Sequence, residues 1–260
     1  MRVKEIMDGR HPFVYEDELA TKARAMIRDF ALRILPVVNE NRRLSGFVSR
    51  GNVMIISSSV SPIRVKGIMT TPKHTAIMED EVVSTVKEMI HLDEWYIPVV
   101  NSTQDETYKG VLGLENFIQA SLETNPHKLS KKVSEVMSTN LFVCYPEDEV
   151  DNVWRLMQKK VFAGLPVVKN KKLVGIVTQK DLLESRAVLP TFESTKGRFR
   201  ASSKISSIMR TSVIAVKPYA KVSKAAELMI SRNIGRIAVK DDKGKLVGIV
   251  DREDVARLLV

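Results

Sequence analysis

The chain has 260 residues, of which 44% are hydrophobic and 28% charged, a balance typical of a globular protein with a sizeable core. No apolar run approaches the roughly 18 residues of a membrane span, no secretory signal is visible, and the single Cys144 excludes an internal disulfide, so we expect a cytoplasmic protein. The net charge of +10 is compatible with dispersed surface charge, or with an anionic partner such as a nucleotide, a nucleic acid or an acidic protein.

Two short sequence markers recur four times along the chain. The first is an apolar residue followed by Met, with the methionines at Met7, Met69, Met137 and Met209. The second is a short apolar run, rich in Val and Ile, whose central positions are Pro36, Pro98, Pro166 and Ala238. Both markers keep the same separations, so the chain consists of four repeats, and this periodicity decides the architecture.

Each repeat has the pattern of a β-α-β-β-α unit. We place the repeats at residues 1–59, 64–122, 133–185 and 205–260, with an inter-module linker at 123–132 and a basic linker at 186–204. The first helix of each unit is predicted by apolar residues at helical spacing: Ala20, Ala23 and Ile27; Val82, Val86 and Met89; Val150, Val153, Trp154 and Met157; Val222, Ala225, Ala226 and Met229. This spacing predicts that Trp154 belongs to a core.

The third repeat shows the end of the unit most clearly. Two apolar strands, Leu165–Val168 and Leu173–Val177, flank a Lys/Asn turn, and a helix follows with Thr178 at its N-cap. A single unit leaves one apolar sheet face uncovered. We therefore expect α/β (α+β) repeats that pack sheet to sheet, the first with the second and the third with the fourth.

These residues carry a resemblance to a known family. The IleMet start, the GLPVV strand and the LVGIVTQKDLL ending resemble CBS domains, whose tandem pairs form Bateman modules. Four copies in one chain are similar to the gamma subunit of AMP-activated protein kinase and to stand-alone archaeal CBS proteins. The resemblance implies two Bateman modules, here arranged as an intramolecular disk, which bind AMP, ADP, ATP or S-adenosylmethionine as a regulatory ligand. It implies no catalysis and no catalytic cofactor.

The resemblance also implies which residues bind the ligand. In the family, a Ser/Thr ends the last strand and an Asp three residues later accepts hydrogen bonds from ribose hydroxyls, while the Ser/Thr and the helix N-terminus hold phosphate. The first position is Ser49, Gly113, Thr178 and Asp251 in the four repeats, and the fourth is Asn52, Asn116, Asp181 and Asp254. All four first-position residues are acceptable N-caps, so capping alone can explain them, whereas an acid at the fourth position favours ribose binding.

The third repeat matches the family best. Its candidate ligand-binding residues are Thr178, Asp181, Lys180, Ala163, Gly164, Leu165 and Pro166. The fourth repeat offers Asp254 and Asp251, with Arg252 or Arg236 to offset the charge of Asp251 towards phosphate. The first repeat offers Ser49, Asn52, Arg50, Arg33 and Ile34. In the second repeat, Gly113, Asn116 and the bulky pair Trp95 and Tyr96 predict an empty or occluded cleft.

Other functions have weaker signals. The four histidines lack metal-ligand spacing and no nucleophile–base pair is recognisable, so we predict no metal site and no enzyme. The alternative is a nucleic-acid-binding protein that uses the basic linker, with Lys196, Arg198, Arg200 and Lys204 around Phe199. A ligand-free scaffold is a third hypothesis. We expect that ligand occupancy alters module packing and is read by a protein partner of unknown identity, and homodimerisation stays open.

Overall fold

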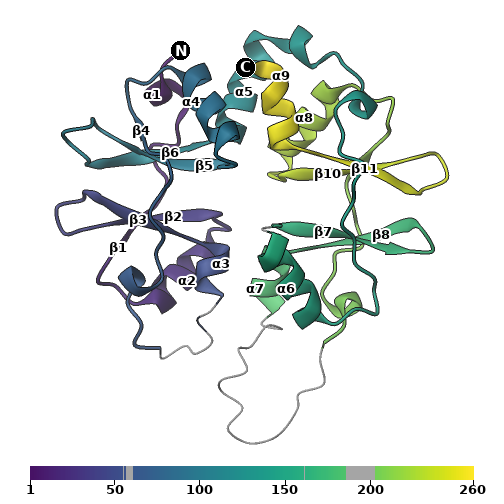
Figure 1. The fold of residues 1–260 in the computed structure, drawn as a ribbon, viewed down its shortest axis with the longest axis horizontal. Coiled ribbons are helices and arrows are strands. Elements are labelled where there is room, and N and C mark those ends of the chain that lie inside the picture. Colours follow the sequence, from purple (N-terminus) through teal and green to yellow (C-terminus); the bar gives the residue numbers. More distant parts are fainter. Residues whose placement is uncertain (55, 57–60, 161, 186–202) are drawn as a thin grey trace, which may run out of the picture.

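The structure, a computed structural model, describes residues 1–54, 56, 61–160, 162–185 and 203–260 (Figure 1). It confirms a mixed α/β fold of small sheets and short helices. Four similar units occupy the four quarters of the molecule in Figure 1, with the sheets in the middle and the helices outside.

The first two repeats form similar series of short elements. The first repeat contains α1 (Val3–Ile6), β1 (Val14–Tyr15), α2 (Ala20–Asp29), β2 (Ile34–Val38), β3 (Leu44–Ser49) and α3 (Arg50–Val53). The second contains the 3₁₀ turn η1 (Val65–Gly67), β4 (Ala76–Ile77), α4 (Val82–His91), β5 (Tyr96–Val100), β6 (Tyr108–Gly113) and α5 (Leu114–Thr124). The turn η2 (Pro126–Leu129) then leads to the second half of the chain.

The third and fourth repeats follow the same order. The third contains η3 (Val133–Glu135), α6 (Val150–Lys160), β7 (Gly164–Lys169), β8 (Lys172–Thr178) and α7 (Gln179–Ser185). The fourth contains η5 (Ile205–Ser207), β9 (Ala215–Val216), α8 (Val222–Ser231), β10 (Arg236–Lys240), β11 (Leu246–Asp251) and α9 (Arg252–Leu259). Where the other repeats have a short first strand, the third has a single parallel bridge between Cys144 and Val167.

The four hairpins share one register. The residue that begins the first hairpin strand always pairs with the N-cap of the following helix, and these pairs are Ile34 with Ser49, Tyr96 with Gly113, Gly164 with Thr178, and Arg236 with Asp251. All four predicted N-caps are therefore confirmed. The common register makes residues of different repeats directly comparable, a relation used throughout the following sections.

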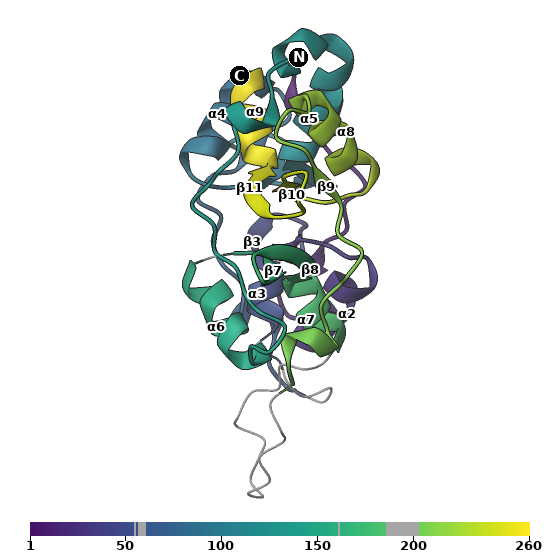
Figure 2. The same ribbon diagram turned by 90° about the vertical axis from the view of Figure 1, so that its right-hand side faces the viewer.

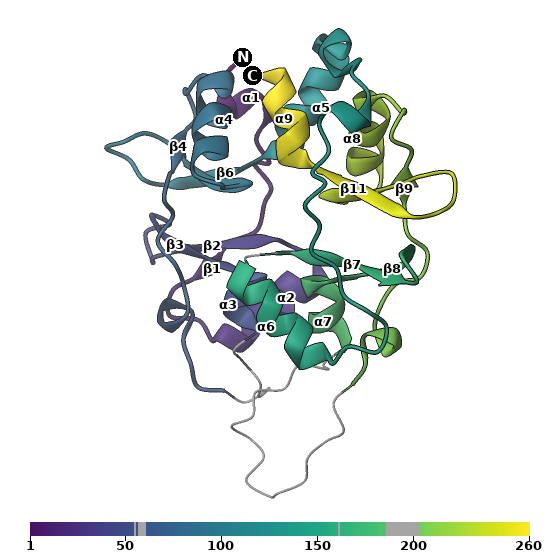
Figure 3. The same ribbon diagram turned by 45° about the vertical axis from the view of Figure 1, so that its right-hand side comes forward.

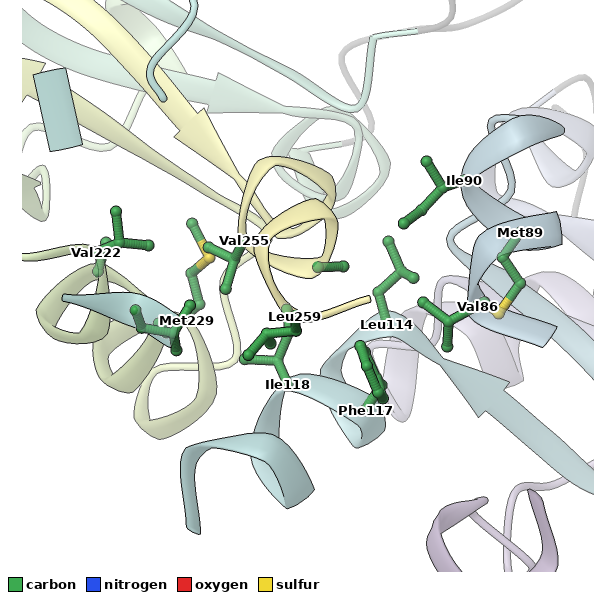
Figure 4. Packing of buried hydrophobic residues seen from close by; sticks show 14 of the residues in the cluster. Val86, Met89, Ile90, Leu114, Phe117, Ile118, Val222, Met229, Val255 and Leu259 are labelled. Carbon is green, nitrogen blue, oxygen red and sulfur yellow. The ribbon is translucent and has the colours of Figure 1, made fainter. Parts of the chain in front are cut away.

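The helices pack between the modules. The predicted apolar stripes are buried in α2, α4, α6 and α8, and Trp154 is a core residue that is only 8% exposed. One apolar cluster joins helices of the second and fourth repeats, including Phe117 and Ile118 of α5 with Val255 and Leu259 of α9 (Figure 4). A second cluster joins the first and third repeats in the same way. Both modules therefore assemble within one chain.

The sheets pack within each module. Ile34 and Val38 of the first repeat contact Tyr108 and Val111 of the second, and Val168 of the third repeat belongs to a cluster with Ala238 and Leu246 of the fourth. We call the first pair of repeats the N-terminal module and the second pair the C-terminal module. The assembly is broad in Figure 1 and narrow in Figure 2, the shape of a disk, and Figure 3 shows the sheets of each module facing one another.

Most of the basic linker, residues 186–202, lies outside the described residues. This part includes Lys196, Arg198, Phe199 and Arg200. Lys204 is described, and its Nζ lies 3.8 Å from a carboxylate oxygen of Glu149. Within the described ranges, no helix combines the length and the apolar character needed to cross a membrane.

Candidate functional site

A cavity of about 410 Å³ lies between the two modules. Most of the residues that line it come from the third and fourth repeats. Ala31, Arg33 and Arg50 come from the first repeat, and Trp95 comes from the second. The volume falls in the range of small-molecule pockets. The C-terminal module thus supplies most of the wall, and the N-terminal module closes it.

The walls of this cavity combine two kinds of surface. Apolar side chains come mainly from the strands and from the segment that follows Met209: Pro166, Ile176, Val213, Ile214, Ala238 and Ile249. Six lining residues are basic, namely Arg33, Arg50, Lys180, Arg210, Arg232 and Arg236. Among the described residues that line the cavity, none is Asp or Glu. An apolar wall with converging cations suits a flat heterocycle that carries anionic groups.

The two arginines from the first repeat lack an acidic partner. Arg50 donates from Nε to the carbonyl of Leu32 at 2.8 Å and from Nη2 to that of Ala31 at 2.6 Å. Arg33 donates from Nη2 to the carbonyl of Asn233 at 3.1 Å. Within the described part of the chain, no carboxylate lies within 4 Å of either guanidinium. Burial, together with the charge of Arg33, lowers the pKa of Arg50 to about 10, and an anion placed beside the two arginines would relieve this cost.

Trp95 lines the cavity from the second repeat and contacts the fourth. Its indole Nε1 donates to Glu253 at 3.3 Å, and the guanidinium of Arg236 lies 4.6 Å from the ring centroid. A Cβ atom added to Gly235 would lie 2.9 Å from this ring, so the glycine makes the close approach of strand β10 possible. Sequence reasoning treated Trp95 as an obstacle in the second repeat. The structure places it in the central cavity instead.

All four helix caps are closed by the residue three positions later. The backbone N–H of the cap donates to Asn52, Asn116, Asp181 and Asp254 at 2.8, 2.8, 2.8 and 2.9 Å. A cap therefore needs no acid at this fourth position, because the amide oxygens of Asn52 and Asn116 serve as capping acceptors as well as the carboxylates of Asp181 and Asp254 do. An acid at this position is weaker evidence for ribose binding than the sequence suggested.

Asp181 makes further contacts. Its Oδ2 also accepts from the Thr178 hydroxyl at 2.6 Å, and its Oδ1 accepts from Arg210 Nε. Arg210 also donates to Glu184 at 3.2 Å. The side chain of Asp181 is 4% exposed and that of Arg210 is 54% exposed. The buried carboxylate is therefore paired with a cation that itself lines the cavity.

The acids of the fourth repeat lie in a more strained electrostatic setting. Asp251 caps α9 by accepting from the N–H groups of Glu253 and Asp254, and its nearest cation, Arg236, is 3.6 Å away. Burial raises the pKa of Asp251. Burial and the neighbouring Asp251 raise the pKa of Asp254 to about 7. Two carboxyl groups that compete in this way disfavour an anionic group nearby.

Of the sequence-predicted ligand residues, half line the cavity. These are Arg33, Arg50, Ala163, Gly164, Pro166, Thr178, Lys180 and Arg236. The others do not line it. Leu165 and Ile34 are buried apolar residues, Ser49 and Asn52 bond to one another in a cap, and Asp181, Asp251 and Asp254 are capping carboxylates.

Arg252 also lies outside the cavity. It is 1% exposed, and its guanidinium contacts the Tyr96 hydroxyl, the Asn233 side chain and, at 3.0 Å, the carboxylate of Glu115. These contacts join α9 of the fourth repeat to the second repeat. Gly164 likewise has a packing reason, because a Cβ there would lie 3.0 Å from Thr178 and 3.1 Å from the Val177 carbonyl.

Sequence reasoning missed several lining segments. They are Arg210–Ile214, directly after the fourth IleMet marker, and Arg232–Gly235, directly before strand β10. The repeat register contained a signal for the first of these segments, because the marker segment of one repeat pairs with the last strand of the other: Arg210 bridges Ile176, and Thr70 bridges Phe47. The contribution of Trp95 had no such signal, since it arises only from the packing of one module on the other.

Comparison with known proteins identifies the family. The sequence model of the CBS domain matches residues 3–58, 133–187 and 205–260, more than half of the chain. The chain belongs to the CBS-domain family. The segment 64–122 lies outside these matches, although it has the same order of strands and helices.

Several relatives share this architecture. The uncharacterized protein MJ1225 of Methanocaldococcus jannaschii is 26% identical over 94% of this chain and 93% of its own length. The crystal structure of MJ1225, described as a proposed archaeal homologue of g-AMPK, aligns with a TM-score of 0.88 at 22% identity over the whole of both chains. Inosine-5'-monophosphate dehydrogenase of the same organism is 30% identical over 53% of this chain, but only 26% of the enzyme is covered. The structural similarity establishes the four-repeat fold.

Proposed function

We propose that this CBS protein is a non-catalytic regulator that binds an adenine nucleotide in the central cavity. The observation that carries the proposal is the cavity itself, with six basic side chains, apolar walls and no carboxylate among the described lining residues. Family resemblance implies an adenosyl ligand. The apolar walls suit an adenine ring, and the cations suit its phosphates.

The charge of the cavity favours AMP, ADP or ATP over S-adenosylmethionine. Arg33 and Arg50 are cationic and hydrogen-bond to backbone carbonyls, and neither forms an ion pair with the described residues, although Glu184 and Asp181 act on Arg50 from a longer distance. An incoming phosphate would therefore gain charge-assisted hydrogen bonds without first breaking an ion pair. A sulfonium cation would meet like charge in the same place. We assign Thr178 and Lys180 to the same phosphate end, and Ala163 and Gly164 to the adenine end.

Signal transmission follows from the origin of the lining residues. The third and fourth repeats supply most of the wall, while Arg33, Arg50 and Trp95 come from the N-terminal module. A ligand that touches all of them stabilises one packing of the modules over others, and a protein partner that contacts both modules would sense this difference. In this proposal the partner recognises the relative position of the two modules.

The test is calorimetric titration of the full chain with AMP, ADP, ATP and S-adenosylmethionine at two salt concentrations. We expect saturable binding of one or two nucleotides per chain and weaker binding of S-adenosylmethionine. Arg50→Met should weaken ADP binding about tenfold, the usual loss for one hydrogen bond to a charged group. Arg43→Met is the matched control, because Arg43 lies at a hairpin tip in an exposed pair with Glu106 and should leave the affinity unchanged.

Three results would overturn the proposal. Equal loss in both arginine variants would indicate general charge attraction. Absence of binding to every adenosyl ligand, together with RNA or DNA binding that falls steeply with salt, would support the nucleic-acid alternative. Absence of both would leave a scaffold.

A further inference from the structure

The family resemblance implies that Asp181 holds the ribose of the ligand, and both of its carboxylate oxygens already have partners. Oδ2 accepts from the Thr178 backbone at 2.8 Å and from the Thr178 hydroxyl at 2.6 Å, which closes the cap of α7. Oδ1 accepts from Arg210 Nε. The cap contacts are part of the helix and cannot be exchanged without loosening it, whereas the arginine belongs to another repeat.

Arg210 is placed to exchange partners. It immediately follows Met209, and its backbone bridges Ile176 of strand β8. Its side chain lines the cavity and is 54% exposed, although it also donates to Glu184 at 3.2 Å. Only the Asp181 side of this ion pair is buried, and the exposed guanidinium can turn towards water or a ligand, so a ligand can compete for it.

The other repeats have no cation in this place. The residues that bridge the last strand in the same register are Asp8, Thr70, Ser138 and Arg210. In the first repeat the contact persists with neutral partners, because Asn52 donates from Nδ2 to the Thr70 hydroxyl at 3.2 Å. Opposite Asp254 stands Ser138, and that carboxyl has no comparable cation. The pair formed by Asp181 and Arg210 is therefore a particular feature of the third repeat.

We propose that Arg210 is a specificity-determining residue that makes the site require a phosphorylated ligand. The ribose hydroxyls can take Oδ1 of Asp181 only when Arg210 releases it. The guanidinium that leaves Asp181 keeps its contact with Glu184 but has lost one of its two carboxylates, in a cavity that already contains five other cations. An anionic group on the ligand can replace the carboxylate that was lost. A nucleoside breaks the ion pair without replacement, and a nucleotide replaces it with a phosphate contact.

This inference rests on the proposed function, and its test compares a nucleoside with a nucleotide. Adenosine and ADP are titrated into the full chain and into Arg210→Met, which removes the charge and keeps most of the side-chain length. In the unaltered protein ADP should bind at least tenfold more tightly than adenosine. In Arg210→Met the affinity for adenosine should rise about tenfold and that for ADP should fall about tenfold, as expected for loss of one charged hydrogen bond in each case.

The controls separate specificity from simple charge loss. Lys180→Met removes another cavity cation, one that pairs with Glu184 at 3.5 Å but has no contact with Asp181, so it should weaken ADP without improving adenosine. Arg210→Lys should restore most of the preference for ADP. Arg210→Gln is a second neutral variant, for use if the Met variant does not fold, and circular dichroism checks the fold of each.

The outcomes are distinct. If adenosine and ADP bind the unaltered protein equally, or if Arg210→Met weakens both alike, Arg210 has only a structural role and the inference is wrong while the proposed function stands. If neither ligand binds the unaltered protein, the proposed function fails and the inference with it. The inference is supported if the affinity for adenosine rises and that for ADP falls in Arg210→Met or Arg210→Gln, and if Arg210→Lys and Lys180→Met do not show these opposite changes.

Discussion

The N-terminal and C-terminal modules have the same backbone plan but differ in what fills the seam between their sheets. The two residues at the start of each hairpin are Arg33 and Ile34, Trp95 and Tyr96, Ala163 and Gly164, and Gly235 and Arg236. Aromatic rings fill the N-terminal seam, where Phe13 and Tyr108 meet edge to face at 5.6 Å. In the C-terminal module, three of the four positions carry Ala or Gly, and all four line the cavity between the modules. Side-chain volume at a few equivalent positions thus distinguishes a packed seam from one that borders open space.

The two modules also differ in how they hold a buried arginine. Arg50 and Arg252 occupy the same position, directly after the N-cap. Arg252 lies 3.0 Å from Glu115 and is almost fully buried, whereas Arg50 has only carbonyl partners and lines the cavity. From this comparison we expect Arg252 to stabilise the contact between the modules, and Arg50 to be available to bind an anion. Four predictions test these differences.

The largest expected effect is on stability. Arg252→Met should lower the free energy of unfolding by about 3 kcal/mol, because it leaves the half-buried Glu115 without its cation and removes the donor to Tyr96. Arg50→Met should cost less than about 1 kcal/mol, because the carbonyls that it leaves have no charge. Urea denaturation of both variants measures the difference. Equal losses would mean that the two arginines have the same role.

The second prediction fills the cavity. Ala163 occupies the position of Trp95, so Ala163→Trp places an indole where the structure has open space. We expect adenine nucleotide affinity to fall roughly a hundredfold, about 2.7 kcal/mol, while the cap bond from Gln179 N–H to the Ala163 carbonyl is retained. Calorimetry measures the affinity, with Ala163→Ser as the control that should bind normally. Unchanged affinity in the Trp variant would place the ligand elsewhere.

The architecture was accessible from sequence because it depends on local, periodic signals. The markers at Met7, Met69, Met137 and Met209, the helical stripes and the N-caps are each visible within a few residues, and the structure confirms all of them. Only about half of the candidate site could be predicted from the sequence. Thr178, Lys180 and Gly164 lie in a recognisable motif, but the capping role of Asp181 and its contact with Arg210 depend on how two repeats face one another.

Contacts between modules were the least predictable. Trp95, Asn233 and Arg33 come together from three repeats, with Arg33 donating to Asn233 across the interface. No local pattern encodes such a meeting, because it depends on the helices that pack the two modules together. The same limitation explains why Arg252 was expected beside a ligand and is found buried in the interface.

The third prediction concerns pH. Asp254 has a raised pKa of about 7 in the fold, so its folded form prefers the proton. The contribution of Asp254 to the free energy of unfolding is then fully present below its pKa in the unfolded chain, near 4, and is lost as the pH rises through its folded pKa of about 7. Asp254→Asn keeps the acceptor for the Asp251 N–H, as Asn52 does for Ser49, and removes the charge. The variant should be about 2 kcal/mol more stable than the parent at pH 8, after allowance for partial solvent exposure.

Denaturation at pH 5, 6.5 and 8 tests this dependence. The stability advantage of Asp254→Asn should shrink steadily as the pH falls, because the parent gains the proton. Asp148→Asn is the comparison, since Asp148 accepts the Tyr145 N–H at 2.8 Å in a turn of the third repeat. An advantage for Asp254→Asn that is constant across pH would contradict the electrostatic explanation.

The smallest expected effect compares the two hairpin turns of the C-terminal module. The turn between β7 and β8 places Asn170 and Lys171 at φ of 51° and 63°, whereas the turn between β10 and β11 uses Gly244 at 79°. Left-handed backbone is unfavourable for Lys and easy for Gly, so Lys171→Gly should stabilise the protein by about 0.5 kcal/mol and Gly244→Ala should destabilise it by about 1 kcal/mol. Thermal unfolding should shift by about +1 and −3 °C. Because the Lys171 carbonyl accepts the Leu246 N–H and the Gly244 carbonyl accepts the Leu173 N–H, a shift of the same sign in both variants would show that contact between the turns outweighs backbone preference.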